Sequence, residues 1–139
     1  MKLSTRSRYG TRLILDLALN GDNGPVTLTE TSERQGISLK YLEKLIRVLR
    51  EAGIVKSKRG PFGGYRLARP TNEISIGDIV RVLEDTRSIT DCTEQEEGCN
   101  ECVRTKSCAM QRVWVEANKA MFDTLDSFKI DTLIAQGSI

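Results

Sequence analysis

This chain of 139 residues contains no histidine and no long apolar run. Histidine is the side chain most often used as a general acid or base near neutral pH, so its absence argues against an enzyme. No stretch approaches the roughly 20 apolar residues of a membrane-spanning helix. The start MKLSTRSRYG also lacks the apolar segment of a signal peptide. We therefore expect a cytoplasmic protein without a membrane partner.

Glycine and carboxylate patterns typical of catalytic sites are missing as well. The run Gly60-x-x-Gly63-Gly64 lies in a predicted hairpin and not before a helix, so it does not indicate a nucleotide-binding loop. No paired carboxylates stand in the apolar context of a catalytic pocket. The sequence predicts neither an enzyme nor a protein that acts on a small-molecule substrate.

Cysteine is scarce but concentrated, because all four cysteines fall within seventeen residues: Cys92, Cys99, Cys102 and Cys108. The surrounding segment is acidic and has few large apolar residues, so it cannot form a core of its own. Clustered thiolates in such a loop are typical of an iron–sulfur or zinc site. Stable disulfides are rare in the cytosol. A redox switch between Cys99 and Cys102, or unligated thiols, is the alternative.

The charges are divided unevenly between the two halves of the chain. Residues 1–72 carry fourteen Lys and Arg against six Asp and Glu, a balance of +8, whereas residues 73–139 have a balance of −6. A basic half joined to an acidic half suggests a module that binds a polyanion, attached to a second functional part.

The basic half has the pattern of a helix-turn-helix followed by a β-hairpin, or wing. A first helix, capped by Ser4 or Ser7, should end near Asn20, and a second, capped by Thr29, should end at Gly36. Ser38 should cap a third helix with a buried stripe at helical spacing, formed by Leu42, Leu45, Ile46 and Leu49. Residues 54–58 and 65–67 then alternate as two strands around a glycine-rich turn.

The third helix and the wing provide the candidate DNA contacts. A recognition helix enters the major groove, where Lys and Arg reach base edges and phosphates. A glutamate facing DNA, such as Glu43, is favourable where it accepts from the amino group of cytosine. We predict DNA contacts from Ser38, Lys40, Tyr41, Glu43, Lys44, Arg47, Arg59 and Gly60.

The C-terminal half predicts a dimer. Apolar side chains recur at three- and four-residue steps through residues 110–128, as in a long amphipathic helix that pairs with a second copy; the alternative is a helix packed only on its own domain. The predicted fold class is mainly α with a small β wing. The predicted divisions are a winged helix-turn-helix (1–84), a cysteine-bearing loop (85–108), a dimerisation helix (109–128) and a short final helix with its tail (129–139).

Three segments closely resemble the iron–sulfur cluster regulator (IscR) family of winged-helix transcription factors: MKLSTRSRYG, SERQGISLKYLEKLIRVLREAGIV and RGPFGGYRL. The resemblance runs from Met1 to about Ile134. It implies a homodimer that binds double-stranded operator DNA under the control of a cysteine-ligated cluster, [2Fe-2S] in preference to [4Fe-4S]. It also implies that Glu43 lets cluster occupancy change which DNA sites are bound.

The chain departs from this family at its ligands. The family usually supplies three cysteines, so the resemblance matches Cys92 and Cys108 and leaves Cys99 or Cys102 as the middle ligand. Gln111 stands where IscR has a ligating histidine, and Cys102 is the obvious replacement. Two further differences are Arg8, where nitric-oxide sensors of the family have an acidic residue, and Phe62, where IscR has glycine.

Overall fold

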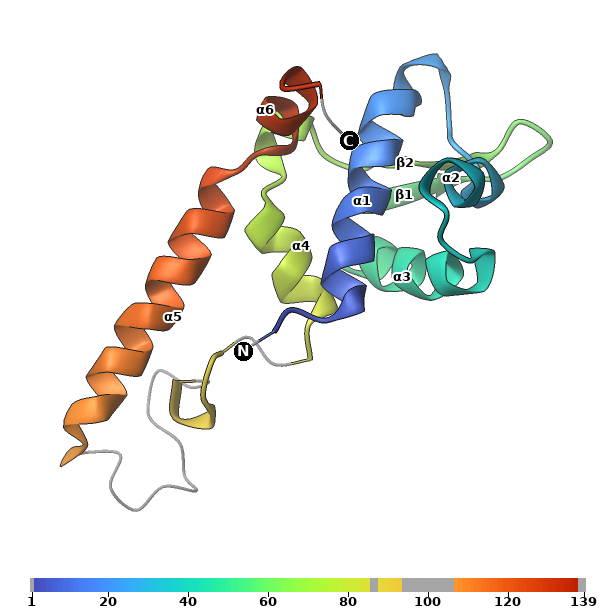
Figure 1. Cartoon of the computed structure of the whole chain (residues 1–139). Coiled ribbons are helices and arrows are strands. Elements are labelled where there is room, and N and C mark those ends of the chain that lie inside the picture. Colours follow the sequence, from blue (N-terminus) through green and yellow to red (C-terminus); the bar gives the residue numbers. More distant parts are fainter. Residues whose placement is uncertain (1, 86–87, 94–106, 138–139) are drawn as a thin grey trace.

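The computed structural model describes residues 2–85, 88–93 and 107–137. These residues confirm the predicted fold class, since they form helices and one two-stranded wing that projects from them (Figure 1). The helices are α1 (Thr5–Asn20), α2 (Leu28–Gln35), α3 (Leu39–Glu51), α4 (Ile76–Leu83), α5 (Ala109–Ser127) and α6 (Ile130–Ala135), with short 3-10 turns η1 (Gly21–Asn23), η2 (Thr71–Glu73) and η3 (Asp91–Thr93). Cys99 and Cys102 lie outside the described residues.

The core of the N-terminal domain forms where α1 crosses α3 and α4. Leu13, Ile14 and Leu17 of α1 are fully buried, as the helical spacing predicts. The hydroxyl of Ser4 caps this helix by accepting a hydrogen bond from the backbone N–H of Arg6. On α4, Leu83 lies so close to Gly10 that a β-carbon there would meet its side chain at 2.0 Å. Glycine is therefore what lets α1 and α4 approach.

The helix-turn-helix is formed by α2 and α3, and one predicted cap is wrong. Thr27, not Thr29, caps α2, because its hydroxyl accepts from the N–H of Glu30 while the Glu30 carboxylate accepts from Thr27. This reciprocal capping box starts the helix two residues earlier, with Leu28 buried. At its end, Gly36 has the predicted left-handed conformation, with φ 63°.

The predicted cap and buried face of α3 are both confirmed. The Ser38 hydroxyl accepts from the N–H of Tyr41 at 3.3 Å. The predicted stripe of apolar side chains is buried: Leu42, Leu45, Ile46 and Leu49. The opposite face of α3 is therefore free to carry charge.

The wing is an antiparallel hairpin of β1 (Val55–Lys58) and β2 (Gly64–Leu67). The turn end of β2 is fixed to the segment before α2, because Val26 and Tyr65 exchange backbone hydrogen bonds of 2.9 and 2.7 Å. Gly64 is required here, since its φ is 153° and a β-carbon would lie 2.6 Å from the carbonyl oxygen of Val26. The hairpin extends beyond α2 and α3 (Figure 1).

The C-terminal part leaves the domain and returns to it. Helix α5 packs on α4 toward its C-terminal end, its N-terminal end points away from the domain, and α6 packs back against α1 and η2 (Figure 1). Backbone hydrogen bonds of 3.0 Å join Ile76 to Phe128 and Ile130 to Ile74. Ile130 is fully buried in the domain core. None of the helices in the described ranges is long and apolar enough to cross a membrane.

Candidate DNA interface and cysteine loop

The exposed face of α3 is basic with one acidic residue. All but one of its predicted contact residues are exposed at the surface, namely Ser38, Lys40, Glu43, Lys44 and Arg47. Leu39, in the first turn, is also 40% exposed. An apolar side chain at that position suits contact with a thymine methyl group, a role that the charge pattern did not indicate.

Tyr41, the remaining α3 candidate, is held by α1. Its hydroxyl lies 3.0 Å from the Thr5 hydroxyl, and its ring packs edge-on against Tyr9 at 5.7 Å between centroids. Thr5 and Tyr41 line a groove of about 710 Å³ between the first turn of α1 and the exposed face of α3. The start of α1 is thus in direct contact with α3.

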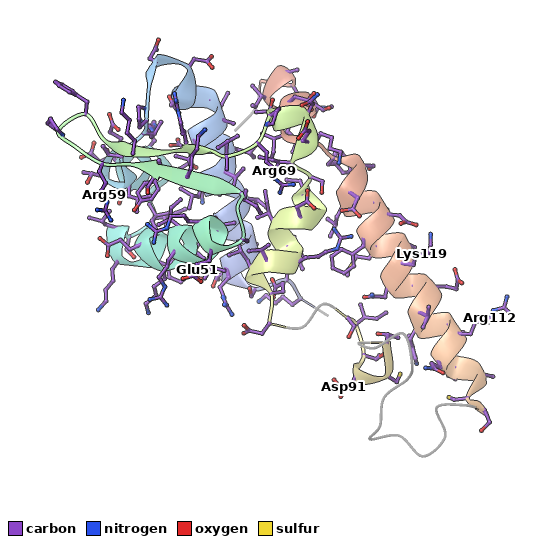
Figure 2. All side chains as sticks on the ribbon, turned by 180° about the vertical axis from the view of Figure 1, so that it is seen from behind. Glu51, Arg59, Arg69, Asp91, Arg112 and Lys119 are labelled. Carbon is purple, nitrogen blue, oxygen red and sulfur yellow. The ribbon has the colours of Figure 1, made fainter. Side chains whose placement is uncertain are left out.

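The wing carries the second group of exposed cations, which are Lys56, Lys58, Arg59 and Arg66. Its turn is closed by a hydrogen bond of 3.0 Å from the Gly63 N–H to the Gly60 carbonyl. Gly60 has a φ of 115°, which favours glycine. Figure 2 shows Arg59 on the side of the molecule opposite Asp91 and Arg112, which mark the cysteine-bearing end.

A buried carboxylate fixes α2 against α1. Asp16 is 1% exposed and accepts hydrogen bonds from Thr31 at 2.8 Å and from both ends of the Arg34 guanidinium at 2.9 and 2.7 Å. Burial by itself would raise the pKa of Asp16, but these donors, with Gln35, hold the pKa below its ordinary value. The carboxylate therefore stays ionised and sets the position of the helix-turn-helix.

A second carboxylate joins the end of α4 to the start of α1. One oxygen of Glu84 accepts from the Ser4 N–H and hydroxyl, both at 2.9 Å, and from the Ser7 hydroxyl at 2.5 Å. Burial opposes ionisation, yet these hydrogen bonds keep the pKa of Glu84 below its ordinary value. Glu84 lies at the entrance to the cysteine-bearing segment. No sequence pattern indicated this contact, because 77 or more residues separate the partners.

Two of the four predicted ligands are placed near one end of α5. Cys92 lies in η3, which packs against α5, and Cys108 directly precedes α5; both thiols are half-buried. The Thr90 hydroxyl lies 3.3 Å from the Cys92 sulfur. Gln111 joins the two cysteines, since its N–H donates to the Cys108 carbonyl and its side-chain amide to the Cys92 carbonyl, each at 3.2 Å. Over the described residues, no three potential ligands come together.

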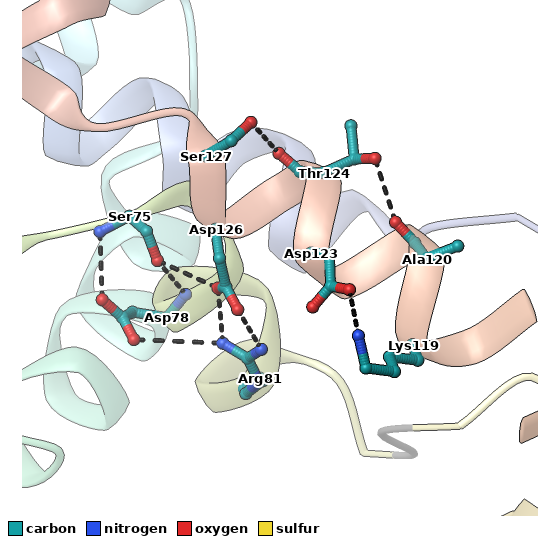
Figure 3. Close-up of polar contacts among 9 residues, drawn as sticks. All are labelled: Ser75, Asp78, Arg81, Lys119, Ala120, Asp123, Thr124, Asp126 and Ser127. Atoms are coloured by element: carbon teal, nitrogen blue, oxygen red, sulfur yellow. Dashed lines mark hydrogen bonds and ion pairs between the residues drawn. The ribbon is translucent and has the colours of Figure 1, made fainter. Parts of the chain in front are cut away.

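One face of α5 is bound to α4 at its C-terminal end. Figure 3 shows Asp126 accepting two hydrogen bonds from Arg81, at 2.7 and 2.6 Å, and one from Ser75 at 3.2 Å. The Arg81 guanidinium also lies over the Phe122 ring, 4.4 Å from its centroid. The hydrogen bond from Arg81 is the main cause of the lowered pKa of Asp126.

The rest of α5 exposes large apolar side chains to solvent. Their exposed fractions are 38–50%, and they are Met110, Val113, Trp114 and Val115. These side chains make α5 the helix with the most exposed apolar residues among those that the structure describes.

Comparison with known proteins connects this arrangement to a family. Residues 3–136 match the family model described as Rrf2, iron-dependent transcriptional regulator. The chain belongs to the Rrf2 family. It is 47% identical to the protein rrf2 of Nitratidesulfovibrio vulgaris over 139 residues, which cover all of this chain and 91% of that protein. The predicted resemblance to the IscR regulators is confirmed.

Solved structures of the Rrf2 family have the same fold. T. potens IscR is 38% identical, with a TM-score of 0.78 over 99% of this chain and 89% of that one. CymR, the global cysteine regulator of B. subtilis, is 33% identical, with a TM-score of 0.78 over 99% of both chains. The chain is accordingly a DNA-binding transcriptional regulator.

Proposed function

We propose that the protein is a homodimeric, operator-binding regulator of the cytoplasm whose DNA binding is controlled by an iron–sulfur cluster at the cysteine loop. The observation that carries this proposal is the position of Cys92 and Cys108. They lie beside the base of the exposed apolar helix α5, in a segment that Glu84 attaches to the start of α1.

The DNA-binding surface consists of α3 and the wing. The N-terminal half of α3 would enter the major groove, with Lys40, Glu43 and Lys44 near base edges. Arg47, Arg59 and the exposed backbone at Gly60 would contact phosphates or the neighbouring minor groove. Two copies paired through α5 would place two recognition helices on a near-palindromic operator.

The donor set near α5 suits a thiolate-ligated cluster. Cys92 and Cys108 are half-buried, and soft thiolates favour iron–sulfur centres and zinc over hard cations. Cys99 and Cys102 would complete the ligands, because Gln111 already uses its side-chain amide on a backbone carbonyl. When bound, an iron–sulfur cluster would supply sensitivity to iron supply, oxidants or nitric oxide, with [2Fe-2S] the form that the IscR resemblance favours.

A continuous set of contacts would couple the loop to the DNA-binding helix. Ligation of Cys92 and Cys108 would fix η3 against α5, and thereby the segment that follows Glu84. Glu84 holds the first turn of α1, where Thr5 contacts Tyr41 of α3. A coupling free energy of only about 1.4 kcal/mol would change DNA affinity tenfold.

A second candidate is a regulator that uses its thiols without a cluster. The likeness to CymR, the global cysteine regulator of B. subtilis, favours this alternative. In that case a disulfide between Cys99 and Cys102, or a zinc ion, would bias the same contacts.

Anaerobic purification followed by an absorbance spectrum and assays of iron, sulfide and zinc separates the two candidates. The cluster proposal expects a coloured protein with stoichiometric iron and sulfide. It also expects that removing iron with a chelator changes affinity for a duplex selected by the protein from a random pool. A colourless protein with stoichiometric zinc, or one whose affinity responds only to thiol oxidants, would contradict it.

A further inference from the structure

The turn of the wing presents one large apolar side chain to solvent. Phe62 is 86% exposed, more than any other large apolar residue that the structure describes. Single exposed apolar residues are common on protein surfaces, so exposure alone does not define a binding site. What distinguishes Phe62 is the backbone that carries it and the charges around it.

The backbone on both sides of Phe62 is constrained. Pro61 precedes it, and the Gly63 N–H closes the turn onto the Gly60 carbonyl at 3.0 Å. A β-carbon at Gly63 would lie 2.3 Å from the Lys58 carbonyl oxygen, so the turn tolerates only glycine there. The pairing of Val26 with Tyr65 also fixes β2 close to the turn. Little backbone entropy would be lost when such a turn binds a partner.

The charges around Phe62 select the partner. Residues 55–69 contain no acidic residue, and four of their cations are exposed: Lys56, Lys58, Arg59 and Arg66. A polyanion is the matching partner, and DNA is the polyanion that this family binds. Proteins that enter the minor groove commonly insert an apolar wedge such as phenylalanine between base pairs, beside arginines that follow the groove.

We propose that Phe62 is a minor-groove wedge, which partly unstacks one base step next to the major groove occupied by α3. This inference rests on the proposed DNA interface and adds a contact that charge alone does not provide. It predicts a preference for a flexible pyrimidine–purine step at the wing position, because such steps unstack most easily.

The test uses a duplex selected by the full-length wild-type protein from a random pool, with 2-aminopurine placed at one position at a time. Wild-type protein should raise the fluorescence of 2-aminopurine at one base step, near the end of the duplex segment that the protein covers. Phe62→Ala should abolish that signal and weaken binding about tenfold, which corresponds to about 1.4 kcal/mol. It should leave the dependence of affinity on salt unchanged, because no phosphate contact is lost. Phe62→Leu, which keeps an apolar wedge, should retain part of the signal.

Arg59→Ala is the matched control from the same turn. It should lower the slope of log affinity against log salt by about 0.9, as expected for one phosphate contact. Thermal unfolding should be equal for all three variants, since both side chains are exposed. Unchanged affinity and fluorescence in Phe62→Ala, or a changed salt slope, would overturn the wedge. Failure of the wild-type protein to select any duplex would instead contradict the proposed operator binding.

Discussion

The side-chain amide of Gln111 donates a hydrogen bond of 3.2 Å to the backbone carbonyl of Cys92, and so attaches the first cysteine of the loop to the first turn of α5. At the position where the IscR resemblance expects a histidine ligand, this chain therefore has a side chain that supports the backbone of Cys92, a proposed ligand. Support of that kind orients a cysteine without coordinating the metal.

Replacing Gln111 should accordingly loosen the cluster without preventing its formation. We expect Gln111→Ala to assemble a cluster anaerobically and to lose it in air about tenfold faster, as is typical when a group behind a ligand is removed. Gln111→Glu, which cannot donate from its ionised side chain, should behave in the same way. The decay of visible absorbance measures this rate. A Gln111→Ala protein that never acquires the chromophore would instead identify Gln111 as a ligand.

Each cysteine can be tested for ligation by replacement with alanine. Cys92→Ala and Cys108→Ala should lose the chromophore, and so should Cys102→Ala if all four cysteines ligate. Iron and sulfide content of the anaerobically purified variants measures this. A cluster that persists in Cys102→Ala would show that ligation by four cysteines is wrong.

Removing the Glu84 carboxylate should uncouple the loop from the DNA-binding helix. Glu84→Ala loses three hydrogen bonds to Ser4 and Ser7 and should destabilise the fold by about 2 kcal/mol. It should also shrink the difference in DNA affinity between the cluster-loaded and cluster-free forms. Tyr41→Phe, which removes only the contact with Thr5, should reduce that difference at nearly unchanged stability.

Asp85→Ala is the control for this experiment. Its carboxylate pairs with Arg6 at 2.6 Å, but the Asp85 side chain is 83% exposed. The effect on stability should stay within about 0.5 kcal/mol, as for most exposed ion pairs. Fluorescence anisotropy of a labelled duplex measures the DNA affinity of the cluster-loaded and cluster-free forms. If the difference between these affinities is equal in Glu84→Ala and wild-type protein, the proposed coupling is contradicted.

The fold should lose stability in acid through Asp16. Because the pKa of Asp16 in the folded protein lies below its ordinary value of 3.8, its contribution is present above that value and is lost as pH falls through the lower, folded pKa. Asp16→Asn should cost about 2 kcal/mol near neutral pH. Urea unfolding can be measured at a series of pH values from neutral to strongly acidic. The free energy of unfolding should then fall less with decreasing pH in the variant than in the wild-type protein. Parallel curves for the two proteins would assign the acid sensitivity to other carboxylates.

The contact between α4 and α5 depends on a glycine. A β-carbon at Gly77 would lie 1.9 Å from an Asp126 oxygen and would displace it from Arg81. We expect Gly77→Ala to cost about 1–3 kcal/mol of unfolding free energy. Gly21→Ala, where nothing lies within 4 Å, should be nearly neutral. Calorimetry of both variants checks this. Equal melting temperatures of Gly77→Ala and Gly21→Ala would mean that α5 can move away from α4 at little cost in stability.

The exposed apolar surface of α5 should hold the dimer together. Trp114→Glu places a charge among apolar side chains and should convert a dimer to monomers at micromolar concentration, with weaker operator binding. Arg112→Glu changes an exposed residue of the same helix and should leave the assembly intact. Sedimentation velocity measures both. A wild-type protein that sediments as a monomer would refute pairing through α5.

Periodicity and turn chemistry determined much of this fold in advance. The buried stripe of α3, its Ser38 cap, the left-handed Gly36 and the glycine-rich wing all follow from signals within a few residues of one another. The cap of α2 was misplaced at Thr29 because Thr27 and Thr29 are both good caps. Thr27 is the cap in the structure, because it exchanges hydrogen bonds with Glu30 and because Leu28, which follows it, is buried.

The sequence by itself thus determined the class of the protein, a winged helix-turn-helix with a thiol-rich loop and a long amphipathic helix. Tertiary structure alone decided how these parts are joined. Glu84 meets Ser4 and Ser7, Asp126 meets Arg81, and Gln111 meets Cys92 across 19 to 80 residues of chain. Contacts at such separations depend on how helices pack, and packing depends on the whole core rather than on a local pattern.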